Sequence, residues 1–192
     1  QGGYALSAAG GSEYISTSDL GNFGSNLDTD FTLASVFRTT DNGAGNIMGV
    51  QNDSSFTSMI FEMRVGSKDA TNGDVEVSLR DAGDNILRIY TDNNYADGNK
   101  HTVVARKVAN TGSDAIEFFI DGSGPVPTSV QSDGGFGSGS VNNFSRPLYL
   151  MADNSSGSVS GSFNGETDNI QIADTSWTTT EIQNYHDSQP WT

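Results

Sequence analysis

The loop at 91–99, TDNNYADGN, gathers side chains whose oxygens could bind a metal or a sugar. The candidate ligand-binding residues are Asp92, Asn94, Tyr95 and Asp97. Carboxylate and amide oxygens ligate calcium or hold sugar hydroxyls, and a tyrosine ring offers a flat apolar face. The same residue types also build tight turns, because Asp and Asn hydrogen-bond to their own backbone. The loop is therefore either a binding site or simply a turn.

His101 follows this loop directly and is the only histidine inside a strand-like pattern. A catalytic histidine needs a nucleophile or a carboxylate within hydrogen-bonding reach. The sequence alone identifies no such partner for His101, so it predicts no catalytic site here.

The chain has 192 residues, which predicts one domain over 1–192. Its formal charge is −15, from 24 acidic and only 9 basic residues. Such a surface repels phosphates, which argues against nucleic acid as a partner and against anionic membranes. The absence of cysteine excludes disulfides, and no apolar run approaches the roughly 18–20 residues needed for membrane insertion. Because the sequence begins at Gln1 rather than Met, we expect a processed or excised segment.

Short segments rich in β-branched and aromatic residues alternate with turns rich in Gly, Asn and Asp. Val75, Val77 and Leu79 alternate with polar residues, which is the period of a strand with one buried face. The predicted strands cover residues 4–7, 31–40, 46–50, 59–65, 75–81, 86–90, 101–108, 116–122, 148–152 and 168–173. So many short strands predict an all-β fold, a sandwich of two antiparallel sheets.

One short C-terminal helix is also predicted. Thr178 followed by Glu181 matches a capping box, in which each side chain satisfies a backbone N–H of the first turn. Ile182 and Tyr185 would then share an inward face, with Trp177 packed before the first turn. By contrast, the Gly- and Ser-rich stretch 129–145 predicts an extended loop.

Four segments in chain order resemble the laminin-G-like and concanavalin A-like jelly rolls, the lectin-glucanase superfamily. They are DFTLASVFRTTD at 30–41, DGNKHTVVARK at 97–107, IEFFIDG at 116–122 and FNGETDNIQIADTSWTTTEIQNY at 163–185. The chain departs from the usual motifs at Lys100, where the family has Trp, and at Thr167, where it has Ile. The resemblance implies a jelly roll, and it implies a packing and hydrogen-bonding role for His101.

In many of these jelly rolls an aspartate of the last strand helps to hold calcium, together with carbonyls near the first strands. By resemblance this implies a calcium site at Asp168, with Gly11 and Glu13 as partners. Calcium accepts about six to eight oxygen ligands, and it would offset charge on an acidic surface. The alternative is that Asp168 only accepts hydrogen bonds at the start of a strand.

Glycoside hydrolases and polysaccharide lyases share this fold. Retaining glucanases of the fold carry both catalytic carboxylates on one strand, which places acid and nucleophile on the same face. The glutamates of this chain show no such spacing, and Glu62, Glu76 and Glu117 look like outward alternates in their strands. The sequence therefore favours a protein that is not an enzyme.

We therefore expect a non-catalytic module that recognises glycans or surface proteins through its rim loops, with one structural calcium. Its expected location is extracellular, at a cell surface or at a virion surface. One alternative is a structural, decoration or adhesion module of a surface assembly, with neighbouring subunits as partners. The other is a polysaccharide-cleaving enzyme of the same fold.

Overall fold

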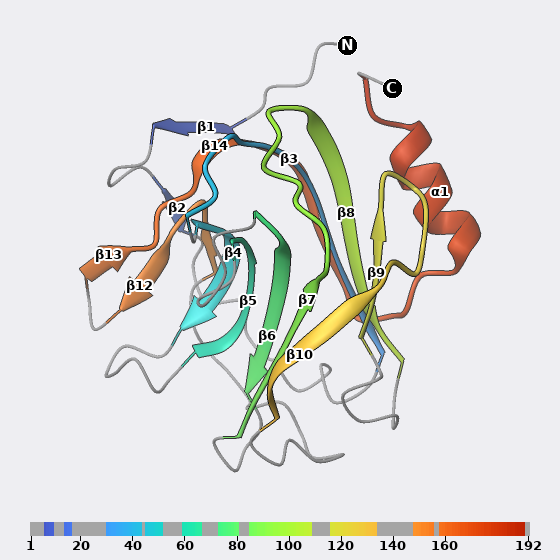
Figure 1. Ribbon diagram of the computed structural model, residues 1–192, viewed down its shortest axis with the longest axis horizontal. Helices are drawn as coiled ribbons and strands as arrows, with labels where there is room; N and C mark the ends of the chain where they lie inside the picture. The colour runs from blue at the N-terminus through green and yellow to red at the C-terminus, as the bar shows by residue number, and fades with distance from the viewer. Residues whose placement is uncertain are drawn as a thin grey trace.

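The computed structural model describes residues 6–9, 14–16, 30–43, 45–51, 59–66, 73–80, 85–108, 116–133, 148–155 and 158–190. Within these ranges the strands form two antiparallel sheets and a separate hairpin (Figure 1). The five-stranded sheet has the order β1-β14-β3-β8-β9. Its strands are β1 (Leu6–Ala9), β14 (Asn164–Ala173), β3 (Phe31–Arg38), β8 (Lys100–Lys107) and β9 (Ile116–Ile120).

The second sheet has seven strands in the order β10-β7-β6-β5-β4-β11-β2. Its strands are β10 (Thr128–Asp133), β7 (Ile86–Thr91), β6 (Val75–Arg80), β5 (Met59–Val65), β4 (Gly45–Gln51), β11 (Tyr149–Leu150) and β2 (Ile15–Ser16). The hairpin pairs β12 (Asp153–Ser155) with β13 (Ser158–Ser160). Two packed antiparallel sheets confirm the predicted sandwich.

The core lies between the sheets and is made by alternate residues of their strands. Phe31, Leu33 and Phe37 of β3 face Val77 and other residues of the seven-stranded sheet within one continuous apolar cluster. All of these side chains are fully or almost fully buried. Burial of each large apolar side chain stabilises the fold by roughly 1.5–3 kcal/mol.

Helix α1 (Thr179–Asp187) begins at a capping box, as the sequence predicts. The Thr178 side chain accepts a hydrogen bond from the backbone N–H of Glu181, and the Glu181 carboxylate accepts one from the backbone N–H of Thr178. This second hydrogen bond lowers the pKa of Glu181. The box therefore satisfies two of the donors that a helix start leaves unpaired.

The helix covers part of the outer side of the five-stranded sheet (Figure 1). Ile182 and Tyr185 are buried there in a small apolar cluster that includes Val36, and the partly buried Trp177 packs against it. The Tyr185 hydroxyl donates to the backbone carbonyl of Asn169 at 2.8 Å, where β14 forms a bulge and Asn169 has a φ of 45°. The predicted inward face of the helix is confirmed.

Two sequence predictions about strands are wrong. Strand β14 begins at Asn164, so Asp168 lies inside the strand instead of at its start. Strand β10 occupies 128–133 of the stretch predicted as a loop, and residues 134–147 lie outside the described ranges. β10 is an edge strand that pairs through its backbone with β7 around a bulge, so it has no clear alternation to reveal it.

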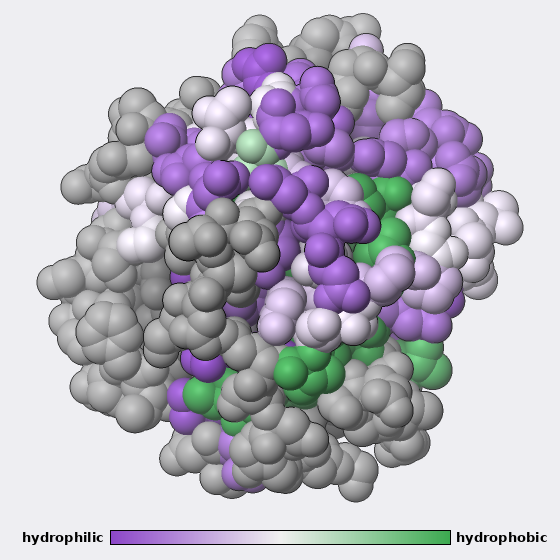
Figure 2. Space-filling view, viewed as in Figure 1, coloured by the Kyte–Doolittle hydropathy of each residue, from purple (hydrophilic) through white to green (hydrophobic). Residues whose placement is uncertain are grey.

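The surface of the described residues is largely hydrophilic. In Figure 2 hydrophobic side chains form small separate patches between hydrophilic ones. Within the described ranges the exposed large apolar side chains are Tyr14, Ile15, Val108 and Val130. Among the described residues no helix is long and apolar enough to cross a membrane.

Candidate functional site

The loop at 91–99 lies at one end of the sandwich, between β7 and β8, and its polar side chains are engaged within its own neighbourhood. Asp92 accepts a hydrogen bond from the Ser129 hydroxyl at 2.7 Å. Asn94 accepts from the backbone N–H of Ala96 at 2.7 Å, and Asp97 accepts from that of Asn99 at 2.8 Å. These are the local hydrogen bonds of turns, so the loop is held in shape without a ligand.

Tyr95 packs against the core instead of standing free on the surface. Its ring is half-buried and meets the ring of His101 edge to face, with 5.4 Å between the ring centroids. An edge-to-face contact of this kind fixes both rings. The tyrosine therefore anchors the loop to β8.

His101 joins the loop to the turn after β9. Its Nδ1 lies 2.8 Å from the carboxylate of Asp121, and its Nε2 lies 3.1 Å from that of Asp97. Both ring nitrogens can donate only when the imidazole is protonated. Burial lowers the pKa of His101, but the hydrogen bonds to Asp121 and Asp97 outweigh it and raise the pKa above its ordinary 6.5. His101 thus packs and hydrogen-bonds, the role that the resemblance implies.

A polar depression of about 350 Å³ adjoins this loop, and we call it the rim depression. Its lining residues come from the end of β3, the loop and the start of β14, and they are Arg38, Thr39, Thr40, Gly98, Asn164, Gly165 and Glu166. Hydrogen bonds join the three segments, because Thr39 donates its hydroxyl to the Asn164 carbonyl at 2.6 Å and its own carbonyl accepts from Gly98 at 2.9 Å. The lining is therefore set in place before any ligand arrives.

Gly165 allows β14 to run close to the end of β3. A Cβ at this position would lie 2.3 Å from the Arg38 carbonyl oxygen, well inside any real contact. A larger residue would thus push the strands apart and reshape the depression. The residues FNGE at 163–166 mark the fold in the sequence, but the depression is not visible there because its parts are remote in sequence.

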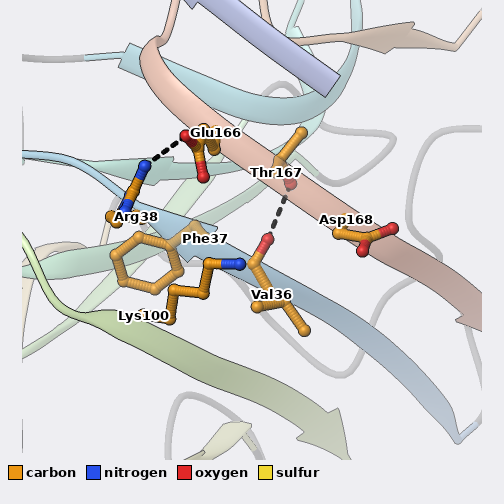
Figure 3. Close-up of a pocket in the computed structure, with 7 residues that line it drawn as sticks. All are labelled: Val36, Phe37, Arg38, Lys100, Glu166, Thr167 and Asp168. Atoms are coloured by element: carbon orange, nitrogen blue, oxygen red, sulfur yellow. Dashed lines mark hydrogen bonds and ion pairs between the residues drawn. The ribbon is translucent and has the colours of Figure 1, made fainter. Parts of the chain in front are cut away.

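A narrow pocket of about 10 Å³ opens on the outer side of the five-stranded sheet, next to the rim depression (Figure 3). Arg38 and Glu166 form an ion pair at its edge, and Lys100 lines it from β8. A pocket of this size holds about one water molecule. The pocket therefore extends the polar character of the rim without adding room for a ligand.

Asp168 also lines this pocket, and its carboxylate points away from the Arg38–Glu166 pair (Figure 3). It accepts a hydrogen bond from the backbone N–H of Asn169 at 2.7 Å. The other predicted calcium ligands, Gly11 and Glu13, lie outside the described residues. Within the described ranges no group of three or more His, Cys, Asp or Glu side chains is placed to hold a metal.

No protein-family model matches the sequence, and a search of curated proteins gives no significant match. A native heptameric SAP-like pentraxin from Limulus polyphemus has a TM-score of 0.58 and 16% identity, over 82% of this chain and 69% of the pentraxin. The Ruminococcus gnavus IT-sialidase CBM40 bound to α2,3-sialyllactose has a TM-score of 0.59 and 17% identity, over 91% of this chain and 96% of the CBM40.

The ligand binding domain of botulinum neurotoxin serotype D, in complex with N-acetylneuraminic acid, gives a TM-score of 0.63 and 10% identity. The match covers 94% of this chain but only 41% of the toxin domain. At such low identities the likeness concerns the arrangement of strands, and that arrangement agrees with the two sheets described above. The chain therefore has the concanavalin A-like jelly-roll fold.

Proposed function

We propose that this chain is a non-catalytic carbohydrate-binding module that holds a glycan in the rim depression. The observation that carries this proposal is the lining itself, which presents hydroxyl, amide, carboxylate and guanidinium groups together in about 350 Å³. Such groups donate and accept hydrogen bonds to sugar hydroxyls, and small-molecule sites span about 300–1,000 Å³. A sugar unit therefore fits the depression in both size and chemistry.

The solved structures of the same fold support this function. The CBM40 was solved with sialyllactose and the toxin domain with N-acetylneuraminic acid, and both are binding domains. From these proteins we propose three properties for this chain. It has a glycan partner, it is extracellular or lies at a cell surface, and it does not catalyse a reaction. The neighbours support each of these points only through their fold.

The test compares two threonine substitutions in glycan binding. Thr40 lines the rim depression, whereas Thr180 is an exposed residue of α1. After a glycan array identifies a ligand, Thr40→Val should weaken its binding roughly fivefold, the loss of about one hydrogen bond. Thr180→Val should leave the Kd measured by calorimetry unchanged. Equal Kd values for wild type and Thr40→Val, or an array without reproducible binding, would contradict the proposal.

We propose, as a separate element of this function, that Asp168 helps to hold a structural calcium ion. Its support is the half-buried carboxylate of Asp168 in the last strand, on a chain with a charge of −15. A ligand that binds only the native state raises its stability. Calcium should therefore raise the Tm of the wild type relative to EGTA, and Asp168→Asn should reduce this difference. An unchanged calcium response in Asp168→Asn would remove Asp168 from the site.

A structural module of a surface assembly is the second candidate, because both edge strands of the seven-stranded sheet expose apolar side chains. Tyr14 and Ile15 lie at β2, and Val130 lies in β10, with exposed fractions of 43%, 43% and 46%. An exposed sheet edge is a template for pairing with another chain. Light scattering should then show concentration-dependent association that Val130→Lys reduces. A monomer at all concentrations would exclude self-assembly.

A further inference from the structure

His101 contacts two carboxylates that come from different parts of the chain. Asp97 belongs to the loop at 91–99, which we call the rim loop, and Asp121 belongs to the turn that follows β9. The side chain of His101 is 11% exposed, whereas those of Asp97 and Asp121 are 45% and 44% exposed. The imidazole is therefore largely buried, and two carboxylates at the surface contact its two nitrogens.

These two contacts need a protonated ring. A neutral imidazole carries one N–H, so it donates to one carboxylate and turns a lone pair toward the other. Nδ1 of His101 lies 2.8 Å from Asp121, closer than the 3.1 Å between Nε2 and Asp97. The other oxygen of Asp121 accepts from the backbone N–H of Thr102 at 3.0 Å, which fixes this carboxylate against β8. Loss of a proton from the ring therefore breaks the contact with Asp97.

Other charged or titratable groups near the ring lie on the outer side of the five-stranded sheet. Lys100 precedes His101 in β8 and pairs with Arg38 of β3, so both point away from the imidazole. Helix α1 contributes His186, whose Nδ1 lies 3.0 Å from the Thr102 hydroxyl on that same outer side. In the part of the chain that the structure describes, the titratable groups that face the ring are Tyr95, Asp97 and Asp121.

The ring gains and loses its proton at a pH where both carboxylates are charged. Burial lowers the pKa of His101, but the hydrogen bonds to Asp121 and Asp97 outweigh it and raise the pKa above 6.5. The hydrogen bond from the Asn99 backbone lowers the pKa of Asp97, so this carboxylate stays ionised while His101 titrates. Both contacts therefore form below the raised pKa of His101, and the Asp97 contact is lost above it.

The Asp97 end of the rim loop forms one wall of the rim depression. Gly98 follows Asp97 directly and lines the depression together with Thr40. Its N–H donates to the Thr39 carbonyl at 2.9 Å, and a Cβ on Gly98 would lie only 3.1 Å from the Thr40 methyl group. A displacement of Asp97 therefore moves the backbone that packs against Thr40.

The middle of the rim loop is held without this proton. The backbone N–H of Tyr95 donates to the Gly73 carbonyl at 2.8 Å, and the Tyr95 ring packs against the core. The hydrogen bonds that Asp97 accepts from Asn99 lie within the loop itself. The contact with His101 is what joins the Asp97 side chain to β8. Its loss therefore frees the Asp97 end of the loop and leaves the rest in place.

We propose that His101 is a pH switch of the rim depression, which holds the Asp97–Gly98 wall in place when the ring is protonated and releases it when the ring is neutral. The wall is then ordered at acidic pH, and a glycan binds it more tightly there. This effect on binding rests on the proposed function. Linkage also requires the reverse, that a bound glycan favours the protonated ring.

The experiment first follows the free protein by NMR from pH 5.5 to 9. The backbone amide signals of Gly98 and Thr40 should shift with the same midpoint as the ring signals of His101. Calorimetry then measures the Kd of the glycan identified by the array over the same range. The Kd should rise roughly fivefold with pH, the loss of about one hydrogen bond.

Three variants separate the switch from other effects of pH. His101→Gln removes the titrating ring, so the Kd and the signals of Gly98 and Thr40 should no longer follow its midpoint. His186→Gln removes the other histidine of the chain and should leave the pH dependence unchanged. Asp97→Asn keeps His101 intact, but an amide accepts from the protonated ring and donates to the neutral one. Its Gly98 and Thr40 signals should therefore stay in place while His101 titrates.

Failure of the switch and failure of the proposed function give different results. If no glycan binds, the proposed function fails, and signals of Gly98 and Thr40 that titrate with His101 still support the switch. Wild-type signals of Gly98 and Thr40 that do not follow His101 would overturn it. A Kd that is constant with pH, or that rises equally in His101→Gln, would overturn it as well.

Discussion

The rim depression and the charged face, which is the outer side of the seven-stranded sheet around Glu62, Glu76 and Arg88, each contain an Arg–Glu pair in opposite surroundings. At the rim, the side chains of Arg38 and Glu166 are 45% and 29% exposed. On the charged face, those of Arg88 and Glu76 are 17% and 0% exposed. The rim loop satisfies its own polar side chains through turns, whereas the charged face leaves four polar atoms without a partner. Similar side chains thus lie at the surface in one place and inside the protein in the other.

The sharpest test of this difference removes the glutamate from each pair. Glu76→Ala leaves Arg88 without its carboxyl, whereas Arg64 keeps Glu62. Removal of one member of a buried pair costs roughly 3–5 kcal/mol. Glu166→Ala removes an exposed ion pair, which contributes at most about 1 kcal/mol. The free energy of unfolding in urea measures both losses. If both variants lost the same free energy of unfolding, the burial of Glu76 would add nothing to stability, and the two regions would not differ.

A second test uses the pH dependence of the rim. The two carboxylates raise the folded-state pKa of His101 above its ordinary 6.5. The stabilising contribution is therefore complete below the unfolded pKa of about 6.5 and is lost as the pH rises through the higher folded value. His101→Gln should cost about 2 kcal/mol at pH 5.5, the scale of charge-assisted hydrogen bonds.

The cost of His101→Gln should shrink as the pH is raised to 9. Unfolding free energies of wild type and variant across this range measure it. Asp121→Asn provides the control, because loss of one carboxylate should lower the pKa of His101 measured by NMR. A cost of His101→Gln that stays constant with pH would show that the histidine contributes by packing alone.

The sequence predicted the regular parts of this molecule because they depend on local chemistry. The alternation of Val75, Val77 and Leu79 marks a strand, and the spacing of Thr178 and Glu181 marks the helix start. The same chemistry explains why Asp92, Asn94 and Asp97 were ambiguous, since turn residues and ligand residues are the same types. In the structure all three oxygens serve the turn or its neighbour, and a ligand role for them stays a prediction.

The rim depression and the burial of Glu76 could not be predicted from the sequence, for a physical reason. Asn164 and Thr40 meet only because β14 pairs with β3, and no local pattern records that pairing. Likewise, Glu76 follows the polar alternation of an exposed strand side, yet it is fully buried. Alternation reports the direction of a side chain, whereas burial depends on the whole fold. The side of the sheet on which Glu76 lies could therefore be predicted from the sequence, but its burial could not.

The smallest effects come from two serines that each donate to one carboxylate. Ser129 donates to the exposed Asp92 at the rim, and Ser78 donates to the buried Glu76 on the charged face. Ser129→Ala should change the free energy of unfolding by less than about 0.5 kcal/mol, because water replaces the lost donor. Ser78→Ala should cost about 1 kcal/mol or more, since the buried Glu76 carboxyl would then lose the hydroxyl that donates to it. Ser78→Ala that loses no more stability than Ser129→Ala would mean that water already reaches Glu76, and the distinction between the two regions would disappear.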